Sequence, residues 1–357
     1  MILAGDIGGT KTLLALYDWK DQRVEPVRQE SYWSEDYGSL EEVLTEFLEE
    51  ESEGIPDVEI SQEPTNSEES KTSPEPSSSP TLTGACFGVA GPVLNNVCRT
   101  TNIPWVIDGQ KIAQHLQMKN VRLLNDLEAT AYGLMELHPD ELESLNPSAS
   151  DQTSGTRALI AAGTGLGQAI LFWDGTRYLV SPSEGGHSDF APNSDTEIEL
   201  LRYLRTSFLH VSYDRVLSGP GIHTIYQFLR DTQKNEPTWF AERLPTGDPA
   251  ALIAEAALSG KPDICAQTLK LFISIYGGEA ANLALKTLAI GGIYLGGGIA
   301  PKILPLLRDG TFLKAFLDKG RYKRLLNKIP VHVILNPKSA LLGAASVAAG
   351  HKQAELF

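Results

Sequence analysis

Gly5-Asp6-Ile7-Gly8-Gly9-Thr10-Lys11-Thr12 is the stretch that decides the fold. An apolar strand leads into it from Ile2 and another leaves it and ends at Tyr17, so residues 2–17 are predicted to form a β-hairpin. Glycines let the backbone approach a ligand closely, and the amides of such a turn can face an anion. The segment is neither a GxxxxGK(S/T) loop nor a dinucleotide fingerprint, because the spacing differs and a strand follows the turn. The alternative is a plain type I′ hairpin with Gly-Gly at its tip.

The same design recurs later in the chain. The apolar strand Leu159-Ile160-Ala161-Ala162 leads into the turn Gly163-Thr164-Gly165-Leu166-Gly167, and a return strand ends at Trp173. The two matching hairpins indicate one ancestral unit used twice, and therefore two similar α/β lobes that face each other across a cleft. We expect a small domain of residues 1–136 plus 338–357, in which the C-terminal helix packs back on the first lobe, and a large domain of residues 137–337.

Apolar periodicity predicts the remaining elements. Predicted helices cover residues 40–53, 129–137, 197–208, 264–288 with an interruption at Gly277-Gly278, and 340–349, and predicted strands cover 82–90, 121–124, 292–295 and 331–335. Residues 61–80 are Ser, Pro, Glu and Thr without a large apolar side chain. Such a stretch cannot bury enough surface to offset its ordering entropy, so it is predicted to be a disordered insertion.

Charge and composition exclude several classes of protein. The formal net charge of −15 repels nucleic-acid backbones and anionic membrane surfaces, so neither is an expected partner. No uncharged apolar run reaches membrane-spanning length, and the N-terminus lacks the pattern of a signal peptide. The three cysteines are scattered and contain no CxxC pair, which argues against a disulfide framework and a structural zinc. We expect a cytoplasmic enzyme.

A third glycine turn, Gly296-Gly297-Gly298, follows a predicted strand and precedes a helix predicted to start near Pro301. With these three turns in this order, the chain resembles the superfamily of sugar kinases, heat-shock 70 ATPases and actin. Along nearly its whole length it is similar to glucokinases of the bacterial hexokinase branch. The most specific matches are Leu124-Asn125-Asp126, the Glu184–Pro192 segment and the Val216–Gly221 segment. The resemblance implies the two-lobed ribonuclease-H-like fold of actin and hexokinase.

The resemblance also implies an activity, the phosphorylation of D-glucose at its 6-hydroxyl by ATP with Mg²⁺. Asp126 stands at the position of the family's general base and Asn125 at that of a sugar ligand, while Glu184 and His187 match ligands of further hydroxyls. Asn102 lies in a loop similar to one that lines the sugar site. Asp214 occupies the place of a family Glu, and its shorter side chain leaves the reach to the sugar and the hexose selectivity open.

The nucleotide is expected at the three glycine turns, whose amides can face phosphate or ribose. Asp6 ends a strand beside the first turn and is the expected magnesium ligand, through water, since Mg²⁺ keeps several waters in its shell. The expected nucleotide-binding residues are Gly5, Asp6, Gly8, Gly9, Thr10, Gly163, Thr164, Gly165, Gly297 and Gly298.

Each site residue also has a structural interpretation. Asp126 and Asp214 could cap helices, and Glu184 could be a surface acid. His187 beside glycines could suggest zinc, but the related kinases and repressors that use such a histidine supply cysteines in a CxCG context that this chain lacks, so zinc is not expected. A kinase for mannose, fructose or an N-acetylated sugar stays open, as does a non-catalytic sugar sensor. A homodimer is expected from the resemblance alone.

Overall fold

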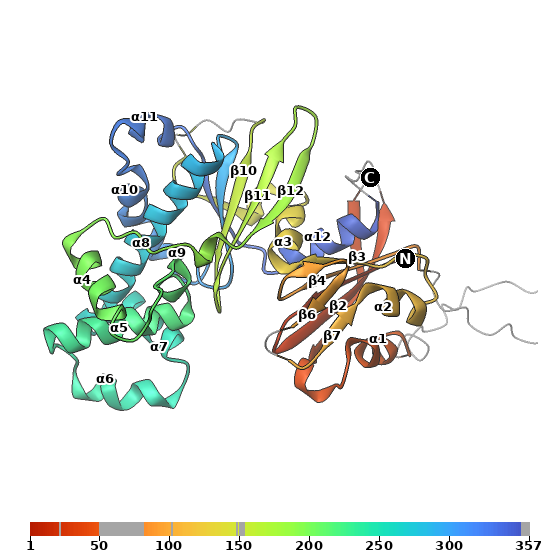
Figure 1. Ribbon diagram of the computed structural model, residues 1–357, viewed down its shortest axis with the longest axis horizontal. Helices are drawn as coiled ribbons and strands as arrows, with labels where there is room; N and C mark the ends of the chain where they lie inside the picture. The colour runs from red at the N-terminus through yellow and green to blue at the C-terminus, as the bar shows by residue number, and fades with distance from the viewer. Residues whose placement is uncertain (21–22, 50–81, 101–102, 148, 150–153, 351–357) are drawn as a thin grey trace, which may run out of the picture. The chain divides into compact units, whose positions relative to one another are not determined.

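The protein is described by a computed structural model that covers residues 1–20, 23–49, 82–100, 103–147, 149 and 154–350 (Figure 1). The chain divides into two compact units. Unit 1 comprises Met1–Glu136 with Ala340–Phe357, and unit 2 comprises Leu137–Ser339. The predicted insertion at residues 61–80 and the candidate sugar ligand Asn102 lie outside the described residues. Within those residues no helix has the length and apolar character needed to cross a membrane.

Unit 1 is built on a five-stranded sheet in the order β3-β2-β1-β4-β8. Its first two strands form the predicted antiparallel hairpin, and β4 and β8 continue the sheet in parallel with β1. The strands are β1 (Ile2–Ile7), β2 (Lys11–Lys20), β3 (Arg23–Trp33), β4 (Gly84–Val89) and β8 (Arg122–Asn125). A separate small sheet comprises β5 (Val93–Leu94), β6 (Val97–Arg99) and β7 (Val106–Asp108).

Unit 2 repeats this plan in a six-stranded sheet of order β12-β11-β10-β13-β14-β9. The second predicted hairpin is β10 paired antiparallel with β11, and β13 and β14 follow in parallel. The strands are β9 (Leu142–Ser144), β10 (Arg157–Ala162), β11 (Leu166–Trp173), β12 (Tyr178–Ser183), β13 (Gly292–Gly296) and β14 (Val331–Ile334). Three antiparallel strands followed by two parallel strands occur in both units, so the predicted α/β fold with two similar lobes is confirmed.

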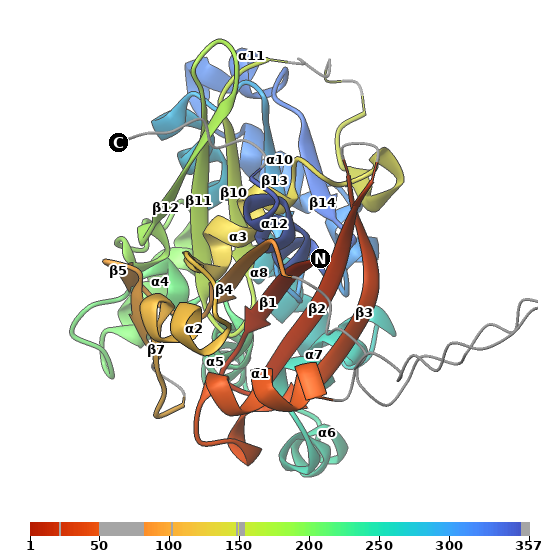
Figure 2. The ribbon, with the colours of Figure 1, turned by 90° about the vertical axis from the view of Figure 1, so that its right-hand side faces the viewer.

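The helices of unit 1 are α1 (Leu40–Glu49), α2 (Gly109–His115), α3 (Asp126–Gly133) and α12 (Ser339–Ala348). The C-terminal helix α12 lies against α3, as Figures 1 and 2 show. A Cβ at Gly343 would overlap the Ala129 carbonyl, so glycine permits the close approach of the two helices. The last residues of the described chain are thereby packed beside the helix that follows Asn125.

The helices of unit 2 surround the 25-residue α8 (Asp263–Thr287). The others are α4 (Asp195–Leu204), α5 (Gly219–Gln233), α6 (Thr238–Arg243), α7 (Pro249–Leu258), α9 (Leu304–Leu307), α10 (Thr311–Leu317) and α11 (Lys323–Leu326).

The interruption predicted at Gly277-Gly278 is wrong. Helix α8 is continuous through Gly277-Gly278, because Gly277 packs against the Phe312 carbonyl at the start of α10 and its lack of a side chain serves that contact rather than a break. The helix expected near Pro301 begins at Leu304 and has four residues, and Pro301 itself lies in a turn.

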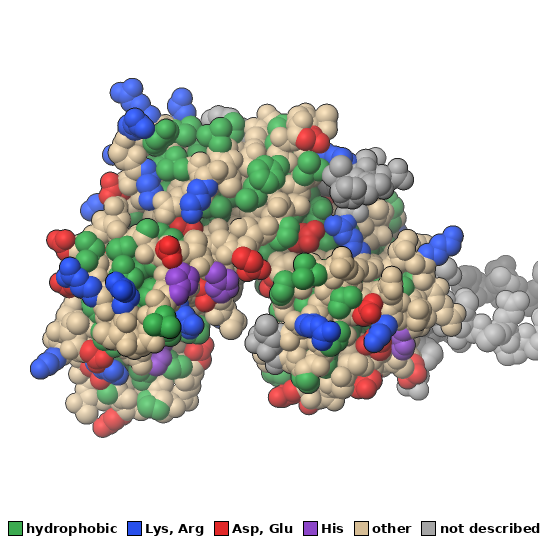
Figure 3. All heavy atoms as spheres, viewed as in Figure 1, with side chains coloured by type: hydrophobic (Ala, Val, Ile, Leu, Met, Phe, Trp, Pro, Cys, Tyr) green, Lys and Arg blue, Asp and Glu red, His purple; other side chains and the backbone are tan. Residues whose placement is uncertain are grey.

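Each unit has its own apolar core. The thiols of Cys86, Cys98 and Cys265 are free and buried within these cores. On the face shown in Figure 3, basic side chains gather at the upper left, in the region of α10 and α11, whereas elsewhere basic and acidic side chains are interspersed.

Candidate active site

The first glycine turn, in unit 1, is held by hydrogen bonds from Ser34, the residue directly after β3. Gly8 N donates to Lys11 O at 2.9 Å, which closes the turn. Ser34 donates from its N to Thr10 O at 3.0 Å and from its Oγ to Gly8 O at 3.0 Å. The buried Thr12 hydroxyl lies 3.1 Å from Ser34 Oγ. These hydrogen bonds to the carbonyls of Gly8 and Thr10 constrain the backbone conformation of the turn.

The type I′ interpretation of this turn is wrong. That turn type needs a left-handed φ at both central residues, and neither Gly8 nor Gly9 is among the residues with such a φ. A left-handed φ required by a type I′ turn therefore does not explain why glycines occur at these two positions. Beside the turn, the Lys11 ammonium stacks over the Trp33 ring at 4.5 Å on the exposed side of the hairpin.

Asp6 and Asp126 are brought together by the parallel strands of unit 1. Asp6 is paired in register with Gly88, and Gly88 with Leu124, so the ends of β1, β4 and β8 lie at one edge of the sheet. Although Asp6 as a residue keeps some exposure, burial of its carboxyl, followed by the charge of Asp126, raises its pKa to about 6. Two carboxyl groups that repel each other in this way form a site suited to a cation.

The residue that caps α3 is Asn125, not Asp126 as one interpretation had it. Asn125 Oδ1 accepts from Leu127 N at 2.9 Å, and its Nδ2 donates to Gly91 O at 3.1 Å. Asp126 is the first residue of the helix, and its Oδ1 also accepts from Leu127 N at 2.9 Å. An amide group can make four hydrogen bonds, so Asn125 retains one donor and one acceptor position for a ligand.

The second glycine turn, in unit 2, is held by the segment before α5. Gly163 N donates to Gly165 O at 2.9 Å, and Gly219 N donates to Gly163 O at 2.8 Å. Ser218 Oγ caps α5 by accepting from Gly221 N at 3.1 Å. The turn therefore lies beside the N-terminus of a 15-residue helix, which adds a favourable field for an anion.

Asp214 also holds the second glycine turn in place, through a hydrogen bond. The interpretation of Asp214 as a helix cap is wrong. Its Oδ1 accepts from Leu166 N at 2.8 Å, across 48 residues of sequence. A Cβ at Gly165 would lie 2.8 Å from the same oxygen, so glycine leaves room for the contact. The second carboxylate oxygen has no hydrogen bond assigned to it among the described residues. Asp214 thus links the second glycine turn to the 3₁₀ turn Tyr213–Arg215.

Glu184 directly precedes the short 3₁₀ turn Gly185–His187 after β12, and His187 is the last residue of that turn. Gly186 packs against the Leu166 carbonyl so closely that a Cβ would overlap it, which fixes this turn against the start of β11. Ser188 Oγ donates to Gly185 O at 2.7 Å. The side chains of Glu184 and His187 are exposed, and His187 Nε2 lies 4.0 Å from Glu184 Oε2.

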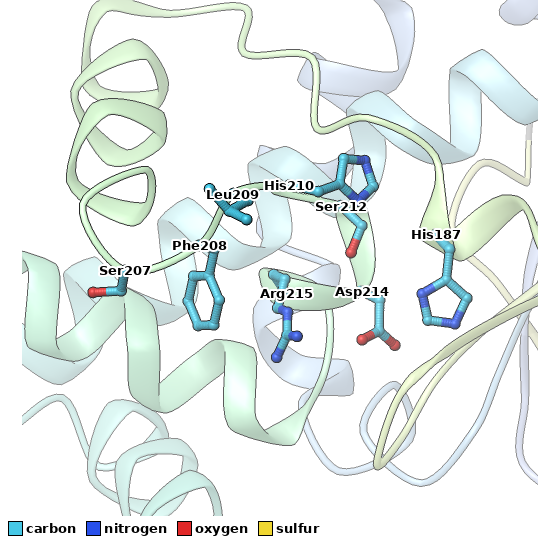
Figure 4. A pocket seen from close by; sticks show the side chains of 8 residues that line it. All are labelled: His187, Ser207, Phe208, Leu209, His210, Ser212, Asp214 and Arg215. Atoms are coloured by element: carbon cyan, nitrogen blue, oxygen red, sulfur yellow. The ribbon is translucent and has the colours of Figure 1, made fainter.

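A cavity of about 340 Å³ opens beside these residues in unit 2. His187 and Asp214 both line it, and Figure 4 shows their side chains extending in the same direction from neighbouring backbone segments. Arg215 also lines the cavity beside Asp214, and its guanidinium stacks on the Phe208 ring at 4.4 Å. The volume of this cavity is in the range of small-molecule sites. The structure therefore brings His187 and Asp214 to one cavity and places Glu184 next to His187.

The third glycine turn packs on the second. Gly297 has a φ of +78°, and a Cβ there would overlap the Ala162 carbonyl, directly before Gly163. Ile299 N donates to the same carbonyl at 3.2 Å. Gly163 and Gly298, in contrast, have no protein atom within 4 Å of the place a Cβ would take. Neither has a left-handed φ, so the fold itself does not need glycine at these two positions.

Sequence patterns did not show how three parts of the site are held in place. Ser34 holds the first turn, but it follows an exposed strand end without a motif. Asp214 was expected at the sugar, whereas its contact with Leu166 depends on tertiary structure. The N-terminus of α5 beside the second turn could have been found, since Ser218 followed by Pro220 is a typical helix start.

Comparisons with known proteins agree with this architecture. A family model for glucokinase matches residues 3–351. The glucokinase of Trichormus variabilis is 42% identical over 364 residues, covering 98% of this chain and 99% of the relative, and that of Synechocystis is 41% identical over 362 residues, covering 97% of each. A solved glucokinase from an Antarctic psychrotroph has a TM-score of 0.79 at 27% identity, covering 98% of both chains.

Proposed function

The chain belongs to the glucokinase family and phosphorylates glucose with ATP, and from this we propose that Asp126 is the general base of the transfer. A kinase mainly positions donor and acceptor in line and neutralises charge, while an aspartate accepts the hydroxyl proton. Asp126 accepts the proton of the glucose 6-hydroxyl as that oxygen attacks the terminal phosphorus of ATP, and the bond from this phosphorus to the bridging oxygen breaks so that ADP leaves. The observation that carries the proposal is the pair of carboxyls at one sheet edge, Asp126 and Asp6, beside the first glycine turn.

Each unit has candidate ligands for the sugar. Asn125 binds a hydroxyl with the donor and acceptor that its capping role leaves over, and Glu184 and His187 bind further hydroxyls with exposed polar ends. The oxygen of Asp214 that is not held by Leu166 is available to another hydroxyl. Sugar hydroxyls both donate and accept, so such paired bonds discriminate among epimers. Asn102 stays a candidate on the family motif alone.

The glycine turns bind the phosphates of ATP, and Asp6 holds Mg²⁺. The donor set fits this ion: Asp6 offers a desolvated carboxyl repelled by a second carboxyl, and Mg²⁺ is bound by one or two carboxylates plus substrate phosphates. When bound, the ion would neutralise charge on the phosphate oxygens. The amides of the first turn, residues 8–10, and of the second, residues 163–165, orient the phosphates. Gly297 and Gly298 lie at the nucleoside.

The third turn offers a matched pair of variants. Gly298→Ala leaves the melting temperature unchanged, since the added Cβ meets no protein atom, but raises the KM for ATP because it occupies the space of the nucleotide. Gly297→Ala lowers the melting temperature by several degrees, since a left-handed φ and a clash with Ala162 cost about 1–3 kcal/mol. Thermal unfolding and steady-state kinetics check both. An unchanged KM for ATP in Gly298→Ala contradicts the nucleotide assignment.

Substitution of Asp214 is expected to change the KM of both substrates, whereas substitution of Glu184 is expected to change the KM of one. Asp214→Ala raises the KM of both glucose and ATP about tenfold, because it releases a sugar ligand and the amide of Leu166 that shapes the second turn. Glu184→Gln raises the KM of glucose alone, since among the described residues its carboxylate has an assigned contact with His187 and none with a glycine turn. Two-substrate kinetics separate the cases. An Asp214→Ala enzyme whose KM for ATP is normal shows that the hydrogen bond to Leu166 does not shape the nucleotide site.

Glucose is the preferred hexose in this proposal, and the shorter Asp214 makes mannose and fructose the competitors to test. A coupled assay of hexose 6-phosphate formation with Mg·ATP compares kcat/KM for the three sugars, and a higher value for another hexose contradicts the preference. A homodimer and a cytoplasmic location are proposed from the family. Light scattering after size-exclusion chromatography tests the first.

A further inference from the structure

A buried carboxylate that the proposed mechanism does not use lies among the elements that carry the sugar ligands of unit 2. Glu279, on α8, is 1% exposed. Its Oε1 accepts from Gln168 Nε2 on β11 at 2.9 Å, and its Oε2 accepts from Asn282 Nδ2 at 3.0 Å. Asn282 Nδ2 also donates to Tyr213 OH at 3.0 Å. Burial of a carboxylate is costly, and these hydrogen bonds offset that cost only while every partner is in place.

One branch of this network reaches the segment that carries Glu184 and His187. Gln168 is 3% exposed and pairs in register with Ser183 at the end of β12. A Cβ at Gly185 would overlap Gln168 Oε1, so the amide group lies directly against the backbone of Gly185. The hydrogen bond from Gln168 to Glu279 therefore fixes the surface on which this segment rests.

The other branch reaches Asp214. Tyr213 is its direct neighbour in the chain and is 3% exposed. The Tyr213 ring packs edge-to-face on Phe190 at 5.7 Å, and its N donates to Ser188 O at 3.1 Å. Burial, followed by the charge of Glu279, to which its hydroxyl is hydrogen-bonded, raises the pKa of Tyr213 above its ordinary value. The hydroxyl thus stays protonated and donates to the carboxylate.

We infer that Glu279 is a positioning residue for glucose binding, which fixes the segment of Glu184 and His187 through Gln168 and fixes Asp214 through Tyr213. The inference rests on the proposed assignment of those three residues as sugar ligands. A carboxylate suits the task because it only accepts, whereas the Gln168 amide, the Asn282 amide and the Tyr213 hydroxyl all donate toward it. A neutral amide in its place would turn a donor toward at least one of them.

Glu279→Gln tests the inference with an isosteric change. We expect the KM for glucose to rise about tenfold or more, since a hydrogen bond to a charged group is lost, while kcat and the KM for ATP stay near their wild-type values. The swapped double variant Gln168→Glu/Glu279→Gln restores an acceptor opposite a donor, so its KM for glucose should return toward wild type. A purely structural role would lower the melting temperature without this split between substrates.

Two further variants keep the test decisive if Glu279→Gln does not fold. Tyr213→Phe removes only the hydroxyl and should raise the KM for glucose severalfold. Glu236→Gln is the matched control, because Glu236 accepts from Tyr226 OH at 2.6 Å in the same unit, and the KM for glucose should not change. The inference is overturned if Tyr213→Phe leaves that KM unchanged or if the swapped variant shows no recovery. An unchanged KM in Glu184→Gln, in contrast, contradicts the proposed sugar site itself.

Discussion

Replacing Asp126 by Asn is expected to lower kcat by about 10³-fold, because general-base catalysis contributes about 10²–10⁴ to a rate. The KM for glucose should change little, since the amide keeps the shape of the side chain and can still hydrogen-bond the 6-hydroxyl. The variant should fold, as the α3 cap is made by Asn125. Steady-state kinetics at saturating glucose and Mg·ATP measure the effect.

Glu128→Gln is the matched control for this experiment. Glu128 lies two residues further along α3, and its carboxylate pairs with Arg122 at 3.3 Å. It should retain kcat close to wild type. Normal turnover in Asp126→Asn, or an equal loss in both variants, contradicts the assignment of the base.

Asp6→Asn is expected to have the second largest effect, with opposite signs for activity and stability. Loss of the magnesium ligand should lower kcat/KM for ATP by about 10²-fold or more, in the range found when one electrostatic stabiliser is removed. The ligand-free protein should become more stable at neutral pH by about 1–2 kcal/mol, less than the roughly 3 kcal/mol that two pKa units represent, since partial exposure screens the charge. Thermal unfolding without Mg·ATP measures the gain.

The stability of the folded protein should depend on pH in a direction that the pKa of Asp6 determines. In the folded state, burial and the charge of Asp126 raise the pKa of Asp6 from its ordinary value of 3.8 to about 6. Its contribution to stability is therefore fully present below the unfolded pKa and is lost as the pH rises through about 6. The contribution of Asp6 should therefore lower the melting temperature of the wild type as the pH rises from 4 to about 6.5. The Asp6→Asn variant should not show this contribution. A wild type and variant with parallel profiles contradict the raised pKa.

The two hairpins and the duplicated sheet could be predicted because their signals are local and occur twice. Tertiary contacts explain where prediction failed. Gly277 is poorly suited to a helix by intrinsic preference, yet α8 continues through it because Phe312 packs there. Asp126 matched a cap, but Asn125 is the cap, since local rules define a boundary only to within a residue or two.

The candidate site was only partly predictable for the same reason. Its ligand types could be read from short motifs, whereas the bond from Leu166 to Asp214 joins residues 48 apart and leaves no local pattern. Glu279 lies in α8, whose sequence also contains Asp263 and Lys270, and nothing in that sequence shows that Glu279 is buried and hydrogen-bonded to Gln168.

A crystal structure with glucose and a non-hydrolysable ATP analogue tests the central claim most directly. The account predicts the Asp126 carboxylate about 2.6–3.2 Å from the glucose 6-hydroxyl, further hydroxyls on Glu184 and His187, and phosphates at the first two glycine turns with a metal ion near Asp6. A sugar bound elsewhere, or bound with its 6-hydroxyl away from Asp126, would contradict it.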